Sequence, residues 1–306
     1  MKINNNFIRM EITNRCNLQC ENCFSLANHR MLPDIPLTNV LKLAQKYKIL
    51  GAKTILLTGG ECTLLNELEY LLYELKMLDY NVCIFTNGSV WNKKQLIINR
   101  NYIDKIYVSL DHENFNDSRG HIACRNRTID FIEELDVLDF NYCIETIVDQ
   151  NNYTNLSWIT DFANKFNVQE WIIGSKYIGH HNTLSEAQEV ELLDCIEKII
   201  ESLHYRVLIR SNIISREQFM YCDEMLDDLF TPYIHLDGTI KPFFLLNDNS
   251  YDLMSIEQLL HTAQPQYHNL YRLEQLKKYI SKKVNDRKCW DFTELIYEGV
   301  EFYDKK

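Results

Sequence analysis

The feature that most constrains the fold is an alternation of short apolar segments with longer amphipathic ones, repeated from residue 7 to residue 203. The short segments are rich in Ile, Val, Phe and Tyr, as β-strands are, and they span residues 7–13, 54–58, 82–86, 105–110, 142–148 and 170–173. The longer segments carry apolar residues at helical spacing, and they span residues 37–50, 64–78, 93–100, 127–138, 155–166 and 186–203. Because parallel strands need a crossover between them, this order predicts an α/β fold with a parallel sheet.

The regular alternation of predicted strands and helices ends at residue 203. A strand is predicted over residues 205–209, a hairpin over residues 233–241 that turns at Asp237-Gly238, and helices over residues 255–261 and 270–283. We therefore expect two domains, an α/β domain over residues 1–203 and a small α+β domain over residues 204–306.

Composition narrows the class of protein and the range of partners. The 32 Lys and Arg against 43 Asp and Glu give a net charge of −11, which disfavours a nucleic acid as partner because its phosphates are neutralised by cations. No apolar run approaches the ~20 residues of a membrane helix, and the first residues lack the apolar segment of a secretory signal. We expect a cytoplasmic protein without membrane contact, in which the 10 cysteines are thiols or metal ligands rather than disulfides.

Three cysteines follow the first predicted strand directly. Cys16, Cys20 and Cys23 have C-x3-C-x2-C spacing, which allows three thiolates of one loop to meet at a metal centre. A [4Fe-4S] cluster held by three cysteines keeps one iron open for another ligand. The spacing equally allows a zinc site completed by a distant His or Cys, and unrelated buried thiols are the third interpretation.

Three further segments stand at the ends of the next predicted strands, in the order Thr58-Gly59-Gly60-Glu61, Thr86-Asn87-Gly88 and Ser109-Leu110-Asp111. Together with the cysteines, they resemble the radical S-adenosylmethionine (radical SAM) enzymes over roughly residues 7–180. The resemblance implies a partial (β/α)6 TIM barrel of parallel strands. It also implies that Cys16, Cys20 and Cys23 hold a [4Fe-4S] cluster whose open iron binds S-adenosylmethionine (SAM).

The resemblance also assigns site residues. Glu61 is expected near the amino group of the methionyl part of SAM, and Ser109 and Asp111 near its ribose or methionyl part. The residues expected to bind SAM are Gly59, Gly60, Glu61, Thr86, Asn87, Ser109, Asp111, Asn152 and Ile173. Asn22 stands where many members carry an aromatic residue that stacks on adenine, and Phe24 is the expected replacement.

Two residues are candidates for the catalytic step. Glu145 replaces the smaller polar residue of the family's fifth strand, so it is expected to contact substrate or ribose if it points into the barrel. Cys62 directly follows the Gly-Gly-Glu segment, where the family usually has proline, and is a second candidate for substrate contact.

The C-terminal hairpin resembles the SPASM or twitch extension of some radical SAM enzymes, which holds further iron–sulfur clusters. Phe243 stands where that pattern has a cysteine, and only Cys222 and Cys289 lie near the positions of other ligands. We therefore expect a degenerate, twitch-like domain without an auxiliary cluster.

The activity implied by the resemblance is reductive cleavage of SAM to a 5′-deoxyadenosyl radical, which abstracts hydrogen from a substrate. An electron donor such as flavodoxin or ferredoxin is the expected partner. The hairpin-bearing extension favours a ribosomally made peptide as substrate. A small molecule (sugar, amino acid or nucleoside) is the alternative, and a non-catalytic metal-binding module is a third hypothesis.

Overall fold

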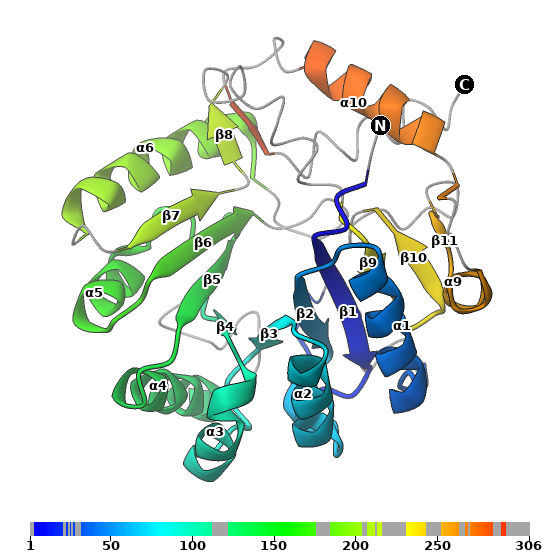
Figure 1. Ribbon diagram of the computed structural model, residues 1–306. Coiled ribbons are helices and arrows are strands. Elements are labelled where there is room, and N and C mark those ends of the chain that lie inside the picture. The colour runs from blue at the N-terminus through cyan, green and yellow to red at the C-terminus, as the bar shows by residue number, and fades with distance from the viewer. Residues whose placement is uncertain are drawn as a thin grey trace.

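The computed structural model describes residues 3–20, 23, 25, 27, 32–111, 122–175, 184–203, 207–211, 213–215, 231–242, 252–262, 267–268, 270–283 and 289–291. A curved sheet of ten strands lies at the centre, with helices along its convex side (Figure 1). Its first six strands are β1 (Phe7–Thr13), β2 (Thr54–Gly59), β3 (Asn81–Thr86), β4 (Lys105–Ser109), β5 (Tyr142–Val148) and β6 (Glu170–Ser175). The helices that alternate with them are α1 (Leu37–Ile49), α2 (Leu68–Met77), α3 (Lys93–Asn99), α4 (Ile122–Val137), α5 (Ser157–Lys165) and α6 (Glu186–Ser202).

The predicted α/β architecture is confirmed. Strands β1 to β6 pair in chain order and in parallel, and the sheet stays open because β7 and β11 form its two edges. This is the partial barrel expected from the sequence. Short 3-10 helices follow two of the elements, η1 (Cys62–Leu64) after β2 and η2 (Arg100–Tyr102) after α3.

Alternation along each strand separates the two faces of the sheet. In β1, Ile8, Met10 and Ile12 are fully buried in the apolar core. Arg9 and Glu11 lie on the opposite face, toward the inside of the barrel, because successive side chains of a strand point to opposite sides. The helices therefore cover an apolar surface, whereas the barrel interior carries polar and charged groups.

The remaining elements come from the C-terminal part of the chain, and they are β7 (Leu208–Ser211), β8 (Ile213–Ser215), β9 (Tyr233–Ile234), β10 (Thr239–Lys241), β11 (Met254–Ser255), α9 (Ile256–His261), α10 (Leu270–Lys283) and β12 (Cys289–Asp291). Strand β9 pairs in parallel with β1, and β10 and β11 continue the sheet outward as a hairpin and its neighbour. Strand β7 pairs with β6 at the other edge. The C-terminal segments thus extend the barrel sheet on both sides, and the boundary at residue 203 stays a prediction.

Strand β7 begins later than predicted, at Leu208 rather than at residue 205. Its pairing with β6 sets this register, because Leu208 lies opposite Glu170 and the Arg210 guanidinium forms an ion pair with the Glu170 carboxylate.

A buried carboxylate joins the hairpin to β1. Glu11 accepts hydrogen bonds from the hydroxyl of Tyr233 (3.2 Å) and the backbone N–H of Leu236 (3.1 Å). The Nδ1 atom of His235 lies 3.6 Å from the same carboxylate. All three side chains that meet here, those of Glu11, Tyr233 and His235, are buried.

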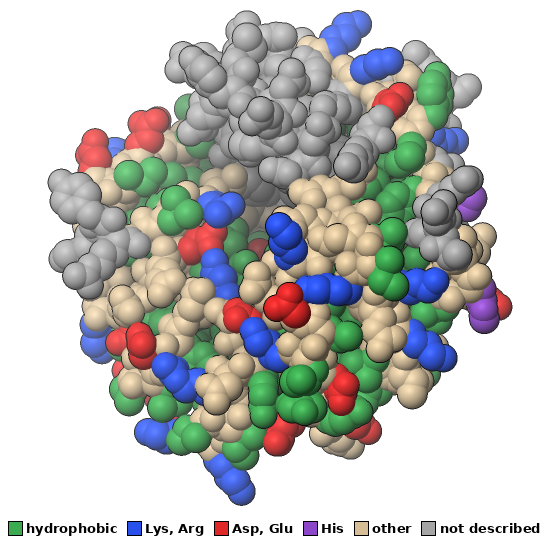
Figure 2. Space-filling view, viewed as in Figure 1, with side chains coloured by type: hydrophobic (Ala, Val, Ile, Leu, Met, Phe, Trp, Pro, Cys, Tyr) green, Lys and Arg blue, Asp and Glu red, His purple; other side chains and the backbone are tan. Residues whose placement is uncertain are grey.

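No helix among the described residues combines the length and the apolar character needed to cross a membrane. Charged side chains of both signs lie interspersed on the face shown in Figure 2. The cytoplasmic location stays a prediction.

The ends of β1 and β2 approach each other so closely that no side chain fits between them. The N–H groups of Gly60 and Glu61 donate to the carbonyls of Thr13 (2.7 Å) and Arg15 (2.8 Å). A Cβ atom on Gly59 would lie 2.3 Å from the Thr13 carbonyl oxygen, and one on Gly60 would lie 2.1 Å from that of Arg15. Gly59 also has a φ of +133°, which side-chain-bearing residues rarely adopt.

We expect Gly59→Ala to destabilise the fold far more than Gly51→Ala. Gly51 also has a positive φ, of +96°, but nothing lies within 4 Å of its added Cβ. The Gly51 substitution should therefore cost only the backbone strain, about 1–2 kcal/mol. Gly59→Ala adds the overlap with Thr13, about 1–3 kcal/mol more. Urea unfolding of both variants measures the difference, and equal losses of stability would contradict the close packing.

Candidate active site

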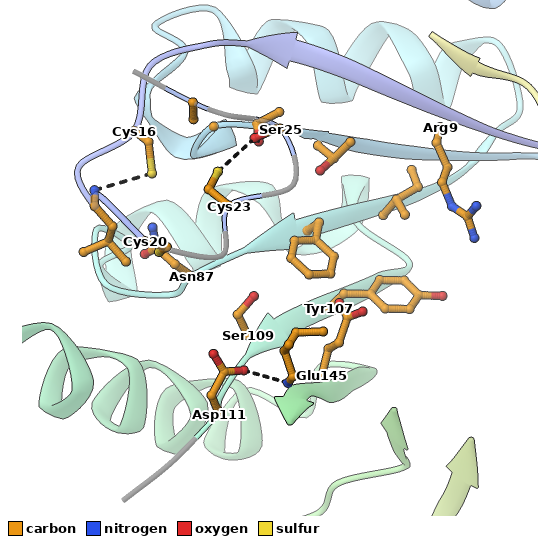
Figure 3. A pocket seen from close by; sticks show the side chains of 18 of the residues that line it. Arg9, Cys16, Cys20, Cys23, Ser25, Asn87, Tyr107, Ser109, Asp111 and Glu145 are labelled. Carbon is orange, nitrogen blue, oxygen red and sulfur yellow. Dashed lines mark hydrogen bonds between the residues drawn. The ribbon is translucent and has the colours of Figure 1, made fainter. Parts of the chain in front are cut away.

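A cavity of about 210 Å³ lies inside the barrel and reaches the loops that follow β1, β2 and β3. Its wall joins residues from strand interiors, strand ends and the cysteine loop. The residues that line it are Arg9, Cys16, Leu18, Cys20, Cys23, Ser25, Ala27, Leu56, Thr58, Gly59, Gly60, Phe85, Asn87, Tyr107, Ser109, Asp111, Glu145, Ile147, Ile172 and Tyr233. The three cysteines lie at one end of the cavity and Arg9 at the other (Figure 3).

The loop after β1 brings its three cysteines to the same end of the cavity. Cys16, Cys20 and Cys23 form no disulfide, and all three are partly exposed. The Cys16 sulfur accepts a hydrogen bond from the backbone N–H of Leu18 (3.4 Å), and the Cys23 sulfur lies 3.4 Å from the hydroxyl of Ser25. Burial raises the pKa of the Cys16 thiol to about 12, so a metal must displace its proton to bind the sulfur.

Side chains fix this loop against the neighbouring strand ends. Asn17 donates to the hydroxyl of Ser89 (2.8 Å) and accepts from the amide of Asn87 (3.0 Å), both in the turn after β3. Ser25 donates to the carbonyl of Gly59 at 2.9 Å.

The first residues of the loop are held by one carboxylate. Asp34 accepts hydrogen bonds from the Thr13 hydroxyl (2.7 Å), the Asn14 backbone N–H (3.1 Å) and the Arg15 guanidinium (2.9 and 3.1 Å). Together with Asn17 and Ser25, this carboxylate ties the loop that carries the cysteines at several points along its length.

Glu61 is the hub of a buried hydrogen-bond network. One carboxylate oxygen accepts from the Thr63 N–H (3.2 Å), the Thr63 hydroxyl (2.8 Å) and the Thr86 hydroxyl (2.7 Å). The other accepts from the backbone N–H of Asn87 at 2.8 Å. The side chain is fully buried, and desolvation raises its pKa against the opposing effect of these four hydrogen bonds.

Five of the residues predicted to bind SAM lie in the cavity wall, and they are Gly59, Gly60, Asn87, Ser109 and Asp111. They come from the ends of three adjacent strands, β2, β3 and β4. One oxygen of Asp111 accepts from the backbone N–H of Ile147 at 2.8 Å, which ties the end of β4 to β5. Parallel α/β folds bind ligands at this edge of the sheet.

The other four, Glu61, Thr86, Asn152 and Ile173, lie outside the lining of this cavity. Thr86 and Glu61 support the turn that presents Asn87. Asn152 bonds to the backbone of Asp149 and Ile147 and thereby caps β5. Ile173 is fully buried in the core, and the alternation of β6 turns its neighbour Ile172 to the cavity instead.

The two predicted catalytic candidates differ in position. Glu145 lines the cavity, and β4–β5 and β5–β6 pairing place it between Ser109 and Ile172. Cys62 is fully buried in the apolar core, where desolvation raises the pKa of its thiol well above the usual value. Asn22, Phe24 and Cys222 lie outside the described residues, as does the side chain of Cys289.

Apart from Glu145, sequence reasoning missed the lining residues that stand in strand interiors. Arg9, Leu56, Phe85 and Tyr107 all line the cavity, yet none belongs to a loop motif. Their position along the strand could have identified them. Side chains two or four residues apart on a strand point to the same face of the sheet, and each of these residues lies at such a distance before an inward-facing residue at the end of its strand. The rings of Phe85 and Tyr107 stack across β3 and β4 with centroids 6.4 Å apart and an interplanar angle of 16°.

The chain resembles several known proteins. It is 31% identical over 110 residues to the mitochondrial GTP 3′,8-cyclase of Arabidopsis thaliana, a match that covers 34% of this chain and 28% of that protein. It is 22% identical over 268 residues to the sporulation killing factor maturation protein SkfB of Bacillus subtilis (strain 168), which covers 82% of this chain and 65% of SkfB.

Among solved structures, SuiB of Streptococcus suis bound to S-adenosylmethionine superposes with a TM-score of 0.67 at 17% identity, over 82% of this chain and 63% of SuiB. SuiB bound to its precursor peptide SuiA gives a TM-score of 0.66 at 18% identity, over 84% of this chain and 65% of SuiB. The chain spans less than two thirds of the length of each of these proteins.

Residues 10–147 match the model of the Radical SAM superfamily. The matched segment contains the cysteine loop and the strand ends of β2, β3 and β4, which are the parts that meet in the cavity. The family implies a [4Fe-4S] cluster and SAM as cofactors. The chain therefore contains a radical SAM superfamily domain over residues 10–147.

Proposed function

We propose that Cys16, Cys20 and Cys23 hold a [4Fe-4S] cluster, that SAM binds between this cluster and the ends of β2 to β4, and that the chain modifies a ribosomally made peptide. The observation that carries the proposal is that three thiols of one loop open into the same cavity as Gly59, Gly60, Asn87, Ser109 and Asp111. When bound, the cluster supplies the electron that cleaves SAM to methionine and a 5′-deoxyadenosyl radical. An electron donor such as flavodoxin or ferredoxin is part of the proposal.

The thiol arrangement favours a cluster over zinc. A structural zinc ion takes four protein ligands, whereas a [4Fe-4S] cluster held by the three cysteines that line the cavity keeps one iron open for SAM. A cubane takes each cysteine at a different iron atom, so its three sulfurs surround a cofactor without touching one another. The hydrogen bond that the backbone N–H of Leu18 donates to the Cys16 sulfur is of the kind that tunes cluster potentials.

The protein's own residues bind and orient SAM and the substrate, and they shield the reaction from water. Ser109 and Asp111 present oxygens toward the cavity between the cysteines and the barrel interior. The apolar side chains of Leu56, Phe85 and Ile172 line the deeper part of the wall. Such a wall keeps water from a reactive carbon centre. Glu145, which stands level with Ser109, is the residue we assign to contact with the substrate.

A peptide substrate is supported by the likeness to two peptide-associated relatives. The matches to SkfB, a maturation protein, and to SuiB, solved with a precursor peptide, each cover more than four fifths of this chain. A small-molecule substrate is the second candidate, because a probable GTP 3′,8-cyclase of Sulfurisphaera tokodaii is 25% identical over 81% of this chain.

Cys20→Ala should abolish SAM cleavage. After anaerobic reconstitution, we expect the wild type to bind about four irons per chain and to form 5′-deoxyadenosine with dithionite and SAM. The variant lacks one of three thiolate ligands, so both the brown chromophore and 5′-deoxyadenosine should be lost. Iron and sulfide analysis and mass spectrometry of the products provide the measurements.

Cys195→Ala is the matched control, since Cys195 lies on α6 away from the cavity and should keep cluster and activity. Bound zinc without a chromophore in the wild type would support the non-catalytic metal module instead. About eight irons per chain would indicate an auxiliary cluster and would contradict the degenerate C-terminal domain.

Glu61→Gln should remove the part of the pH dependence of folding stability that the Glu61 carboxyl group causes. Because the folded pKa of Glu61 lies above the 4.5 of the free side chain, the folded state holds this proton more tightly than the unfolded state. The wild type is therefore most stable relative to the variant below pH 4.5, and it loses this advantage as the pH rises through the raised pKa. Each tenfold difference in proton affinity between the folded and unfolded states corresponds to about 1.4 kcal/mol of this advantage.

Urea unfolding of both proteins between pH 4 and pH 8 measures this difference, and the other titrating groups cancel in it. Glu69→Gln, an exposed position on α2, should show a flat difference over the same range. A wild-type advantage that grows with pH would mean that the four hydrogen bonds outweigh burial.

A further inference from the structure

We propose that the end of the cavity opposite the cysteines is an anion-binding subsite, in which Arg9 and Tyr107 bind a carboxylate or phosphate group of the substrate. This inference rests on the proposed function, because it concerns the substrate of the same cavity. It names a property that the substrate must have, a planar or apolar body that ends in an anionic oxygen group.

Arg9 is placed to meet a ligand rather than the solvent outside the barrel. It extends from the interior of β1 into the cavity at the end remote from Cys16, Cys20 and Cys23, and the Tyr107 side chain reaches toward it from β4 (Figure 3). Its guanidinium carbon lies 5.2 Å from the centre of the Phe7 ring, which orients the group. A guanidinium binds carboxylate and phosphate oxygens with two parallel hydrogen bonds.

Tyr107 supplies a neutral hydrogen-bond donor. Burial raises the pKa of its phenol, so the hydroxyl keeps its proton at neutral pH and can donate it to an anion. The Nζ atom of Lys105 lies 5.0 Å from the centre of the same ring and is paired with the carboxylate of Glu170. The charge on Arg9 lowers the pKa of this phenol against the effect of burial, so the guanidinium acts on Tyr107 from the cavity.

The carboxylate nearest to Lys105 is compensated by two cations. Lys105 and Arg210 both form ion pairs with Glu170, whose carboxylate is nearly buried. The carboxylate of Glu11 on β1 accepts hydrogen bonds from Tyr233 and Leu236 of the hairpin. Arg9 brings its guanidinium to the wall of the cavity itself.

Glu145 determines which end of an anionic substrate lies at the subsite. Strand pairing places it level with Ser109, two residues nearer the strand ends than the level of Tyr107. Its carboxylate repels an anion in the middle of the cavity, so the anionic end of a substrate is directed to Arg9. The stacked rings of Phe85 and Tyr107 offer a flat apolar surface to the part in between.

Small aromatic probes test the subsite without knowledge of the natural substrate. Benzoate, phenyl phosphate and the uncharged benzamide are titrated into the anaerobically reconstituted full chain with SAM present, and affinities are read by ligand-observed NMR. We expect at least one anion to bind roughly tenfold or more tightly than benzamide, and Arg9→Gln to remove this preference, because a charge-assisted hydrogen bond is lost. The tighter of the two anions identifies the group as carboxylate or phosphate.

Arg9→Lys keeps the charge without the bidentate geometry and should retain an intermediate preference. Arg100→Gln removes an exposed arginine far from the cavity and should bind all three probes as the wild type does. Thermal unfolding shows whether Arg9→Gln is folded. If it is not, the proposal is tested by the Arg9→Lys variant and by the preference of the wild type for anions over benzamide. Equal binding of anions and benzamide by the wild type, or an unchanged preference in Arg9→Gln, overturns the proposal. Failure of the proposed function shows separately, as absence of 5′-deoxyadenosine from the wild type.

Discussion

The contact between the ends of β1 and β2 is the constraint on which the rest of the site depends. Gly59 and Gly60 lie so near the backbone of Thr13 and Arg15 that the two strand ends share hydrogen bonds without any side chain between them. The cysteine loop starts at this point. Since its first residues are also bound by Asp34, the loop leaves the sheet in a fixed direction and carries its thiols over the cavity.

The buried carboxylate of Glu61 extends this constraint to the next strand. Its hydrogen bonds to Thr86 and Asn87 join the end of β3 to the segment after β2, and Asn87 in turn holds Asn17 of the cysteine loop. Hydrogen bonds to a charged group contribute about 1.5–3 kcal/mol each, which offsets part of the cost of burying the charge, and the pKa of Glu61 stays raised by desolvation. Three strand ends thus form one rigid rim, and a cofactor held by the loop has a defined position relative to β4 and its Asp111.

The sequence allowed the rim to be predicted because its parts are local. Gly-Gly-Glu after β2, Thr-Asn-Gly after β3 and the cysteines after β1 each stand directly behind an apolar segment, so strand assignment alone places them at one edge. The face of the sheet to which a strand residue points was harder to predict, as Ile173 shows. A shift of one residue along the strand moves a side chain from the cavity to the core, and the neighbour Ile172 has the same side chain. The contact of Glu11 with Tyr233 joins residues 222 positions apart, and no local pattern encodes a pairing of that range.

The two ends of the cavity differ in the kind of residue that forms them, local motifs at strand ends in one case and strand-interior side chains in the other. The rim consists of glycines and short polar side chains in segments that resemble the superfamily, so it suits a cofactor that all members share. The deep end consists of Arg9 and Tyr107 from strand interiors, together with Tyr233 from the C-terminal hairpin. These positions can change side chain without disturbing the backbone contacts of the rim. Substrate choice can therefore change at the deep end while the chemistry at the rim is retained, and the hairpin contributes to that choice because Glu11 holds Tyr233 in the wall.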